Sequence, residues 1–95
     1  MSSACHNEEV EAATALAQIK GFASAYRIVF GNHALERMEL RHVGTDDVRE
    51  ALLTATSCRP EGEPKWKVSG GHDLDGDELT VIVLLVRGVV VVTAY

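Results

Sequence analysis

Apolar residues recur at helical spacing in the first quarter of the chain. Over residues 8–25 they fall every three or four positions, and this spacing predicts an amphipathic helix. Three glutamates in the expected first turn suit the positive end of a helix dipole. The predicted apolar stripe consists of Val10, Ala13, Leu16 or Ala17, and Ile19 or Lys20.

Two more helices are expected before the middle of the chain. Residues 26–30 alternate and form either a short strand or an extended entry to the next helix. Gly31 and Asn32 supply a cap for a helix over residues 33–42. Thr45 is expected to cap a third helix that stops near residues 56–60. The core stripe of this third helix is predicted to be Val48, Ala51, Leu52 and Ala55.

The second half of the chain has the pattern of strands. Residues 65–69 alternate, with Trp66 and Val68 on one face and Lys65, Lys67 and Ser69 on the other. Residues 70–77 form a polar loop. Two β-branched runs, residues 78–86 and 89–95, are separated by two residues and predict a hairpin.

The hairpin is apolar on both faces. From residue 79 to residue 92, 11 of 14 residues are large aliphatics, which is typical of strands buried on both sides. The second and third helices are expected to cover one face. The stripe of the first helix is narrow and rich in alanine, so the other face predicts a homodimer or a protein complex, formed through the sheet or the first helix.

Composition narrows the class of protein. The chain has 95 residues, 46% of them hydrophobic and 24% charged, which indicates one small globular domain. A net charge of −5 argues against a protein that grips nucleic acid by bulk electrostatics, but it permits a local basic site. Two cysteines are too few for a disulfide framework. The start of the chain lacks the pattern of a signal peptide. No apolar run is long enough to span a bilayer. We therefore expect a soluble cytoplasmic protein.

One cluster of residues has chemical potential. His33, Arg37 and Arg41 are spaced four residues apart and fall on one face of the expected helix. An imidazole beside two guanidinium groups suits an anionic substrate. The alternative is a solvated face in which the arginines pair with nearby glutamates, and the spacing alone leaves both interpretations open.

The surrounding motifs add a resemblance. Six motifs follow one another along the chain: His-Ala-Leu-Glu-Arg-Met at residues 33–38, Arg41, Thr-Asp-Asp-Val at 45–48, Trp-Lys-Val-Ser-Gly at 66–70, Asp-Gly at 75–76 and the closing Thr93-Ala94-Tyr95. Together they resemble a bacterial family of small domains of unknown function. Its members carry an H-A-x-x-R-M-x-x-R stretch and end in T-x-Y or T-x-F. The resemblance covers residues 28–95, so residues 1–25 form an additional N-terminal helix.

Members of that family are similar to RelE- and MqsR-type ribonuclease toxins, which are often encoded beside antitoxins with a YgiT-type zinc finger. The resemblance implies an α+β fold with N-terminal helices packed on an antiparallel sheet of three to four strands. It also implies metal-independent RNA cleavage by the ribose 2′-hydroxyl without a cofactor, with a cognate antitoxin and RNA or the ribosome as partners.

The same resemblance assigns roles to individual residues. His33 is the expected base or acid, Arg37 and Arg41 clamp the phosphate, and Tyr95 stacks on a base or donates a proton. Thr93 is an expected substrate contact from the same motifs, and Lys67 is an expected contact because it lies on the polar face of the strand over residues 65–69. The alternatives are a surface lysine for Lys67 and, for Tyr95, a terminal aromatic residue that packs on the sheet edge. Ala34 and Met38 match the motif as core positions.

Two other sequence patterns do not predict a metal site, and one other function competes with the toxin. The pattern Asp73-x-Asp75-x-Asp77 imitates a calcium loop, but its glycine is misplaced and Leu84 occupies the twelfth position, so it predicts an acidic turn. Cys5, His6, His42, Cys58 and His72 lack zinc-ligand spacing. The competing function is a non-catalytic interaction or regulatory module, which the doubly apolar hairpin and the acidic charge favour. A gene for a small antitoxin beside the coding gene would favour the toxin.

Overall fold

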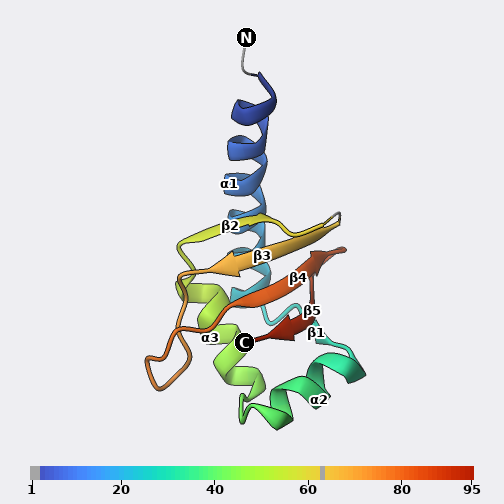
Figure 1. Cartoon of the computed structure of the whole chain (residues 1–95), viewed down its shortest axis with the longest axis vertical. Helices are drawn as coiled ribbons and strands as arrows, with labels where there is room; N and C mark the ends of the chain where they lie inside the picture. The colour runs from blue at the N-terminus through green and yellow to red at the C-terminus, as the bar shows by residue number, and fades with distance from the viewer. Residues whose placement is uncertain (1–2, 63) are drawn as a thin grey trace.

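The computed structural model describes the backbone of residues 3–62 and 64–95, and the side chains of residues 11–62 and 64–95. Within these residues the fold is α+β, with three helices and five strands (Figure 1). The helices are α1 (Ser3–Ser24), α2 (Asn32–Leu40) and α3 (Thr45–Thr54). The strands are β1 (Ile28–Phe30), β2 (Ser57–Pro60), β3 (Lys65–Ser69), β4 (Val81–Leu85) and β5 (Val89–Ala94).

The five strands form one open, mixed sheet in the order β1-β5-β4-β3-β2. Strand β1 runs parallel to β5, and every other neighbouring pair is antiparallel. The expectation of three to four antiparallel strands is therefore wrong, although the α+β class is right. The sequence pattern did not reveal β2, because its four residues include a proline and carry one buried side chain. The three-residue β1 corresponds to one of the two alternatives for residues 26–30.

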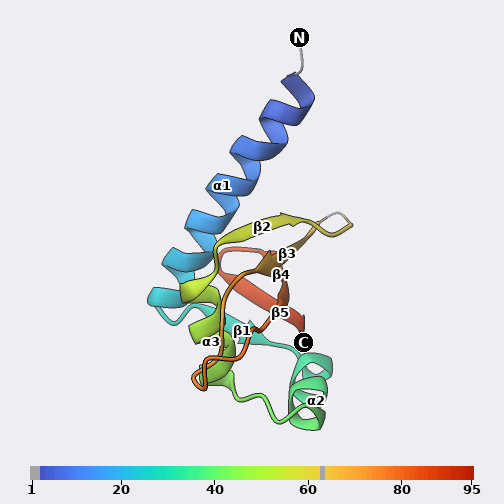
Figure 2. The same ribbon diagram turned by 60° about the vertical axis from the view of Figure 1, so that its left-hand side comes forward.

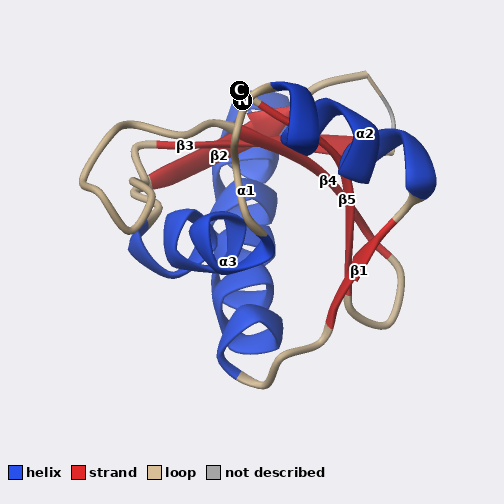
Figure 3. Cartoon of the chain, turned by 90° about the horizontal axis from the view of Figure 1, so that it is seen from below, coloured by secondary structure: helices blue, strands red, loops and turns tan. Residues whose placement is uncertain are grey.

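The helices form two groups. Helices α1 and α3 pack against each other, with α1 also against β2 and α3 against β4, whereas α2 packs beside β5 and apart from them (Figure 3). The N-terminal half of α1 extends beyond the sheet (Figure 2), and the molecule measures 46 × 25 × 23 Å. The predicted pairing of the second and third helices on one face is wrong. Since α2 directly follows the edge strand β1, it begins at that edge and lies next to β5.

The core lies between the sheet and the helices. The β4–β5 hairpin buries alternate valines completely, and α3 buries its whole predicted stripe. The stripe of α1 runs through Ala15, Ile19 and Ala23, with Leu16 partly buried, whereas Ala13 is exposed. The predicted Ala13 is wrong because an alanine-rich helix offers several neighbouring stripes, and packing selects one of them. The side chain of the predicted Val10 lies outside the described residues.

The ends of the helices differ from the predicted caps. Helix α2 ends at Leu40, two residues earlier than expected, and Arg41 is its C-cap. Gly44, rather than Thr45, is the N-cap of α3, and its N–H donates to the Asp47 carboxylate at 2.9 Å. A carboxylate in the third helical position satisfies a free N–H group at the start of the helix, so Thr45 is free to begin the helix itself.

The second face of the hairpin is less exposed than expected. Ile82 is buried, with 6% of its surface exposed, and Leu84, Val90 and Val92 are half-buried. These residues belong to the apolar face for which a dimer or a partner was predicted. That assembly stays a prediction, and sedimentation of the purified protein tests it. In residues 3–62 and 64–95, no helix combines the length and apolar character that a membrane span requires.

Arg49 connects α3 to the end of α1. Its Nε donates to the Ala23 carbonyl at 2.9 Å, one Nη donates to the Ser24 carbonyl at 3.4 Å, and its guanidinium carbon lies 3.9 Å from the centroid of the Tyr26 ring. Carbonyls in the last turn of a helix have no partner within the helix, and a cation there also opposes the helix dipole. Arg49 therefore stabilises the end of α1.

We expect the Arg49→Ala variant to lower the free energy of unfolding by about 2 kcal/mol, through the loss of charge-assisted hydrogen bonds. Denaturation in urea measures the change. The exposed Arg27 supplies the control, since Arg27→Ala removes one positive charge without this contact. Equal stability of the two variants would show that Arg49 does not cap α1.

Candidate functional site

The sheet face opposite the valine core is mixed: it is largely apolar over the β4–β5 hairpin and carries polar side chains toward β2 and β3. Strand pairing aligns Arg59 with Lys67, Lys67 with Ile82, and Ile82 with Thr93. Directly paired residues project from the same face of a sheet. This row crosses β2, β3, β4 and β5, and it puts two cations and a hydroxyl group on one surface.

A β-bulge sets the position of Thr93. The register of the β4–β5 pair shifts between Ile82 and Val83, so that Ile82 faces Thr93 while Val83 faces Val91. A bulge inserts one extra residue into a strand. Because of this insertion, Thr93 lies on the polar face although Val91 lies in the core.

Two cations converge on the last residue of the chain. The guanidinium carbon of Arg41 lies 5.6 Å from the centroid of the Tyr95 ring, and Lys67 Nζ lies 6.0 Å from the same centroid. Arg41 Nη1 also donates to the Ala94 carbonyl at 3.3 Å. We call Arg41, Lys67 and Tyr95 the cationic cluster. Arginine and lysine side chains are the usual partners of phosphates, and a tyrosine ring can pack against a base.

The end of α2 directs Arg41 into this cluster. The Arg41 N–H still donates to the carbonyls of Arg37 and Met38, but the backbone of Arg41 has left the helical conformation. Its side chain consequently turns toward β5. The observed partners of this exposed side chain are the Ala94 carbonyl and the Tyr95 ring, and its role in binding stays a prediction.

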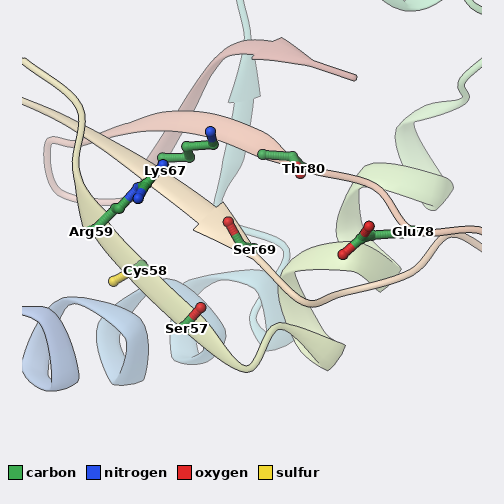
Figure 4. A pocket seen from close by; sticks show the side chains of 7 residues that line it. All are labelled: Ser57, Cys58, Arg59, Lys67, Ser69, Glu78 and Thr80. Atoms are coloured by element: carbon green, nitrogen blue, oxygen red, sulfur yellow. The ribbon is translucent and has the colours of Figure 1, made fainter.

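A hollow adjoins the cationic cluster. It measures about 450 Å³ and lies over β2, β3 and the segment before β4 (Figure 4). Its lining combines hydroxyl groups, two cations and one carboxylate: Ser57, Cys58, Arg59, Lys67, Ser69, Glu78 and Thr80. Lys67 belongs both to this lining and to the cationic cluster. We call it the polar hollow.

The structure separates the remaining predicted residues from the cluster. His33 lies in the first turn of α2 and Arg37 in the last, and both side chains are exposed. Eight residues of α-helix correspond to about 12 Å along the axis, so His33 lies well away from Arg41. Arg41 contacts Ala94 and Tyr95 from the C-cap of α2, whereas no such contact is present for the described side chains of His33 and Arg37, so the joint role of the three residues stays a prediction. Ala34 and Met38 are buried, as predicted for core positions.

The sequence did not single out most of the polar hollow. Ser57, Arg59, Glu78 and Thr80 were missed because β2 was not recognised and the segment before β4 was assigned to a strand. The sequence signal for β2 is the polar–apolar–polar alternation of Ser57, Cys58 and Arg59, of which only Cys58 is buried. Alternation over three residues is too short to identify a strand by itself.

The acidic loop has a structural role. One carboxylate oxygen of Asp73 accepts the N–H groups of Asp75 and Asp77, each at 2.9 Å, and Asp47 accepts the N–H of Leu74 at 3.1 Å. Carboxylates that accept backbone N–H groups in this way stabilise turns. The prediction of an acidic turn is confirmed. Among the described side chains, no group of three histidines, cysteines or carboxylates is placed to hold a metal ion.

Cys58 borders the polar hollow but points away from it (Figure 4). Its thiol lies beneath α1 and donates to the Ala12 carbonyl at 3.1 Å. Burial raises the pKa of the Cys58 thiol above its usual value. The thiolate is the reactive form of cysteine, so Cys58 is a core residue rather than a nucleophile.

We expect slow alkylation of Cys58 by iodoacetamide in the native Cys5→Ser variant, and rapid alkylation in denaturant. Burial raises the pKa of the thiol in the folded protein above its pKa in the unfolded protein. This shift stabilises the folded state at a pH below the pKa of the unfolded thiol, and the stabilisation is lost as the pH rises through the pKa of the folded thiol. Labelling between pH 7 and pH 10, followed by mass spectrometry, checks this expectation. Equal rates in the native and the unfolded protein would contradict it.

The fold and the site together define a small α+β domain whose open mixed sheet presents a cationic, hydroxyl-bearing face. The model of the DUF4258 family, described as a domain of unknown function, matches residues 30–95. The match covers most of the chain, and the protein belongs to this family. It begins in β1 and includes every later helix and strand, while α1 precedes it. No curated protein and no solved structure matches the chain significantly.

Proposed function

We propose that the protein is the toxin of a toxin–antitoxin pair and that it cleaves RNA as a metal-independent endoribonuclease. The observation that carries this proposal is the convergence of Arg41 and Lys67 on Tyr95. The resemblance of residues 33–41 and 93–95 to families related to RelE- and MqsR-type toxins supports it, because these motifs supply two members of the cationic cluster.

The proposed reaction is a transesterification. The ribose 2′-hydroxyl attacks the adjacent phosphorus, the bond from phosphorus to the 5′-oxygen breaks, and the products are a 2′,3′-cyclic phosphate and a 5′-hydroxyl. Charge accumulates on the phosphate oxygens as the new bond forms. Cations fixed beside those oxygens stabilise the transition state, and in this proposal Arg41 and Lys67 provide that stabilisation.

The reaction also moves two protons. A base removes the proton of the 2′-hydroxyl, and an acid gives a proton to the departing 5′-oxygen. The motif resemblance assigns one of these roles to His33, which lies at the opposite end of α2 from Arg41. We assign Tyr95, which belongs to the cationic cluster, either to proton donation or to stacking on a base. The Tyr95→Phe variant distinguishes proton donation from stacking, because phenylalanine keeps the ring and loses the hydroxyl. Retained cleavage in this variant would assign Tyr95 to stacking.

The substrate contact must be local. The chain carries a net charge of −5, so RNA is attracted by the cationic cluster and Arg59 rather than by the whole surface. Few phosphate contacts produce a shallow dependence of affinity on salt. Arg37 and Thr93 complete the proposed contacts, Arg37 from α2 and Thr93 from the polar face of β5.

Incubation of the purified protein with an RNA oligonucleotide in the presence of EDTA tests the proposal. We expect fragments that end in a 2′,3′-cyclic phosphate, and we expect slower growth when the protein is produced alone in a bacterial host. His33→Ala and Arg37→Ala should relieve both effects. Intact RNA together with normal growth at high expression would overturn the proposal.

A neutralising protein partner belongs to the same proposal. Helix α2 exposes two leucines, Leu40 with 77% and Leu35 with 41% of its surface accessible. Exposed apolar side chains beside a functional site suit a protein interface. We expect co-production with the antitoxin to restore growth and to yield a complex that co-purifies with this chain.

A further inference from the structure

We infer that the polar hollow binds the nucleobase next to the cleaved phosphate and selects guanine, with Glu78 as the residue that determines specificity. This inference rests on the proposed function, because it names the part of RNA that the same surface reads. The hollow is about 450 Å³, which falls within the range of small-molecule binding sites.

The polar hollow is continuous with the cationic cluster. Lys67 belongs to both, and Thr80 forms two backbone hydrogen bonds of 2.8 Å with Tyr95, one in each direction. A nucleotide whose phosphate is held by Lys67 therefore has the hollow beside it for its base. Single-stranded RNA is recognised in this manner, through bases turned out of the stack and bonded at their edges.

The charges at the two ends of the hollow differ. Figure 4 shows Arg59 and Lys67 at one end, and the Glu78 carboxylate at the other, directed toward Ser69 and Thr80. An ionised carboxylate only accepts hydrogen bonds, cations only donate them, and hydroxyl groups do both. The hollow is therefore complementary to a ligand that has hydrogen-bond donors on the side facing Glu78 and acceptors on the side facing Arg59 and Lys67.

Guanine is the RNA base with this arrangement. Its N1–H and N2–H groups are adjacent donors that match the two oxygens of one carboxylate. Adenine and cytosine present one amino group beside an acceptor nitrogen, and uracil presents one N–H between two carbonyls. The O6 and N7 atoms of guanine are acceptors, and arginine or lysine is their usual partner.

The backbone on either side of Glu78 is held in place. Glu78 pairs with His72 in an isolated β-bridge, and the Leu79 N–H donates to the Gly71 carbonyl at 3.1 Å. The His72 N–H donates to the Thr54 hydroxyl of α3 at 3.0 Å. These contacts fix the segment to the core, so that the backbone of Glu78 has a defined position beside the hollow.

Titration with guanosine 5′-monophosphate and adenosine 5′-monophosphate, followed by NMR or calorimetry, tests the inference. We expect the guanine nucleotide to bind about tenfold more tightly, as one well-formed bidentate base contact provides. Glu78→Gln should remove this preference and leave the affinity for the adenine nucleotide within twofold. Glu61→Gln, in the exposed turn between β2 and β3, is the matched control and should bind as the wild type does.

Two results would overturn the inference: equal binding of the two nucleotides by the wild type, or an unchanged preference in Glu78→Gln. Cleavage of RNA oligonucleotides that differ only in one guanine distinguishes it from the proposed function. RNA cut without regard to guanine would reject the guanine site and keep the ribonuclease. Selective binding of the guanine nucleotide through Glu78 with intact RNA would reject the ribonuclease and keep the guanine site.

Discussion

Replacement of both Arg41 and Lys67 by methionine is expected to reduce RNA cleavage by at least about a thousandfold. Each cation is proposed to stabilise the charge that develops on the phosphate, and removal of one such group from an active site typically costs about a hundredfold to a thousandfold in rate. Methionine keeps much of the length of both side chains. Single-turnover cleavage of a labelled oligonucleotide at saturating protein measures the chemical step separately from binding.

A matched control removes the same charge elsewhere. Lys20 lies on α1 and Arg27 lies in the connection to β1, so the variant with both replaced by methionine has the same net charge as the test variant. It should cleave RNA within about threefold of the wild-type rate, since half-buried Lys20 and exposed Arg27 both lie outside the proposed site. Equal losses in the two double variants would mean that overall charge, rather than the cationic cluster, determines cleavage.

Gly71→Ala is expected to lower the free energy of unfolding by about 3 kcal/mol or more. A Cβ atom at this buried position would lie 1.9 Å from the carbonyl oxygen of Ala51, and within about 3 Å of two more backbone atoms of that residue. The obstacle is the backbone of α3, so rotation of a side chain cannot relieve the contact. At roughly 4–8 °C per kcal/mol for a domain of this size, Tm should fall by more than about 10 °C.

Gly21→Ala provides the opposite case. An added Cβ at Gly21 meets nothing within 4 Å, and the residue lies within α1. Alanine is favoured over glycine in a helix by about 1 kcal/mol, so this variant should be slightly more stable than the wild type. Thermal unfolding followed by circular dichroism compares the two. A stable Gly71→Ala protein would show that α3 and the loop after β3 are not in close contact.

Periodicity predicted α3 and β3 best. The predicted stripe of α3 is buried throughout, and β3 alternates around buried Val68 and half-buried Trp66. The longer α1 is rich in alanine, and its stripe was predicted only in part. Strands β1 and β2 depend instead on their neighbours. The three residues of β1 pair in parallel with β5, and the four residues of β2 pair with β3 at the other edge of the sheet. Neither strand is long enough for its alternation of polar and apolar residues to identify it alone.

The candidate site depends on details that a local pattern does not contain. Thr93 reaches the polar face through a bulge, and Arg41, the C-cap of α2, contacts the Ala94 carbonyl and the Tyr95 ring. The sequence indicated a role for Arg41, Lys67 and Tyr95 through motif resemblance. It could not show that residues separated by 26 and 28 positions converge on one ring, since only the tertiary fold brings them together.

The central claim is that RNA binds on the sheet face that carries the cationic cluster and the polar hollow. NMR of the ¹⁵N-labelled protein, titrated with an oligonucleotide whose 2′-hydroxyls are replaced by hydrogen so that it cannot be cleaved, tests this claim most directly. We predict shifts of backbone amide signals in β2, β3, β5 and around Arg41, while the signals of α3 stay in place. Shifts confined to α1 and α3, or none at saturating oligonucleotide, would contradict the assignment of this face to RNA.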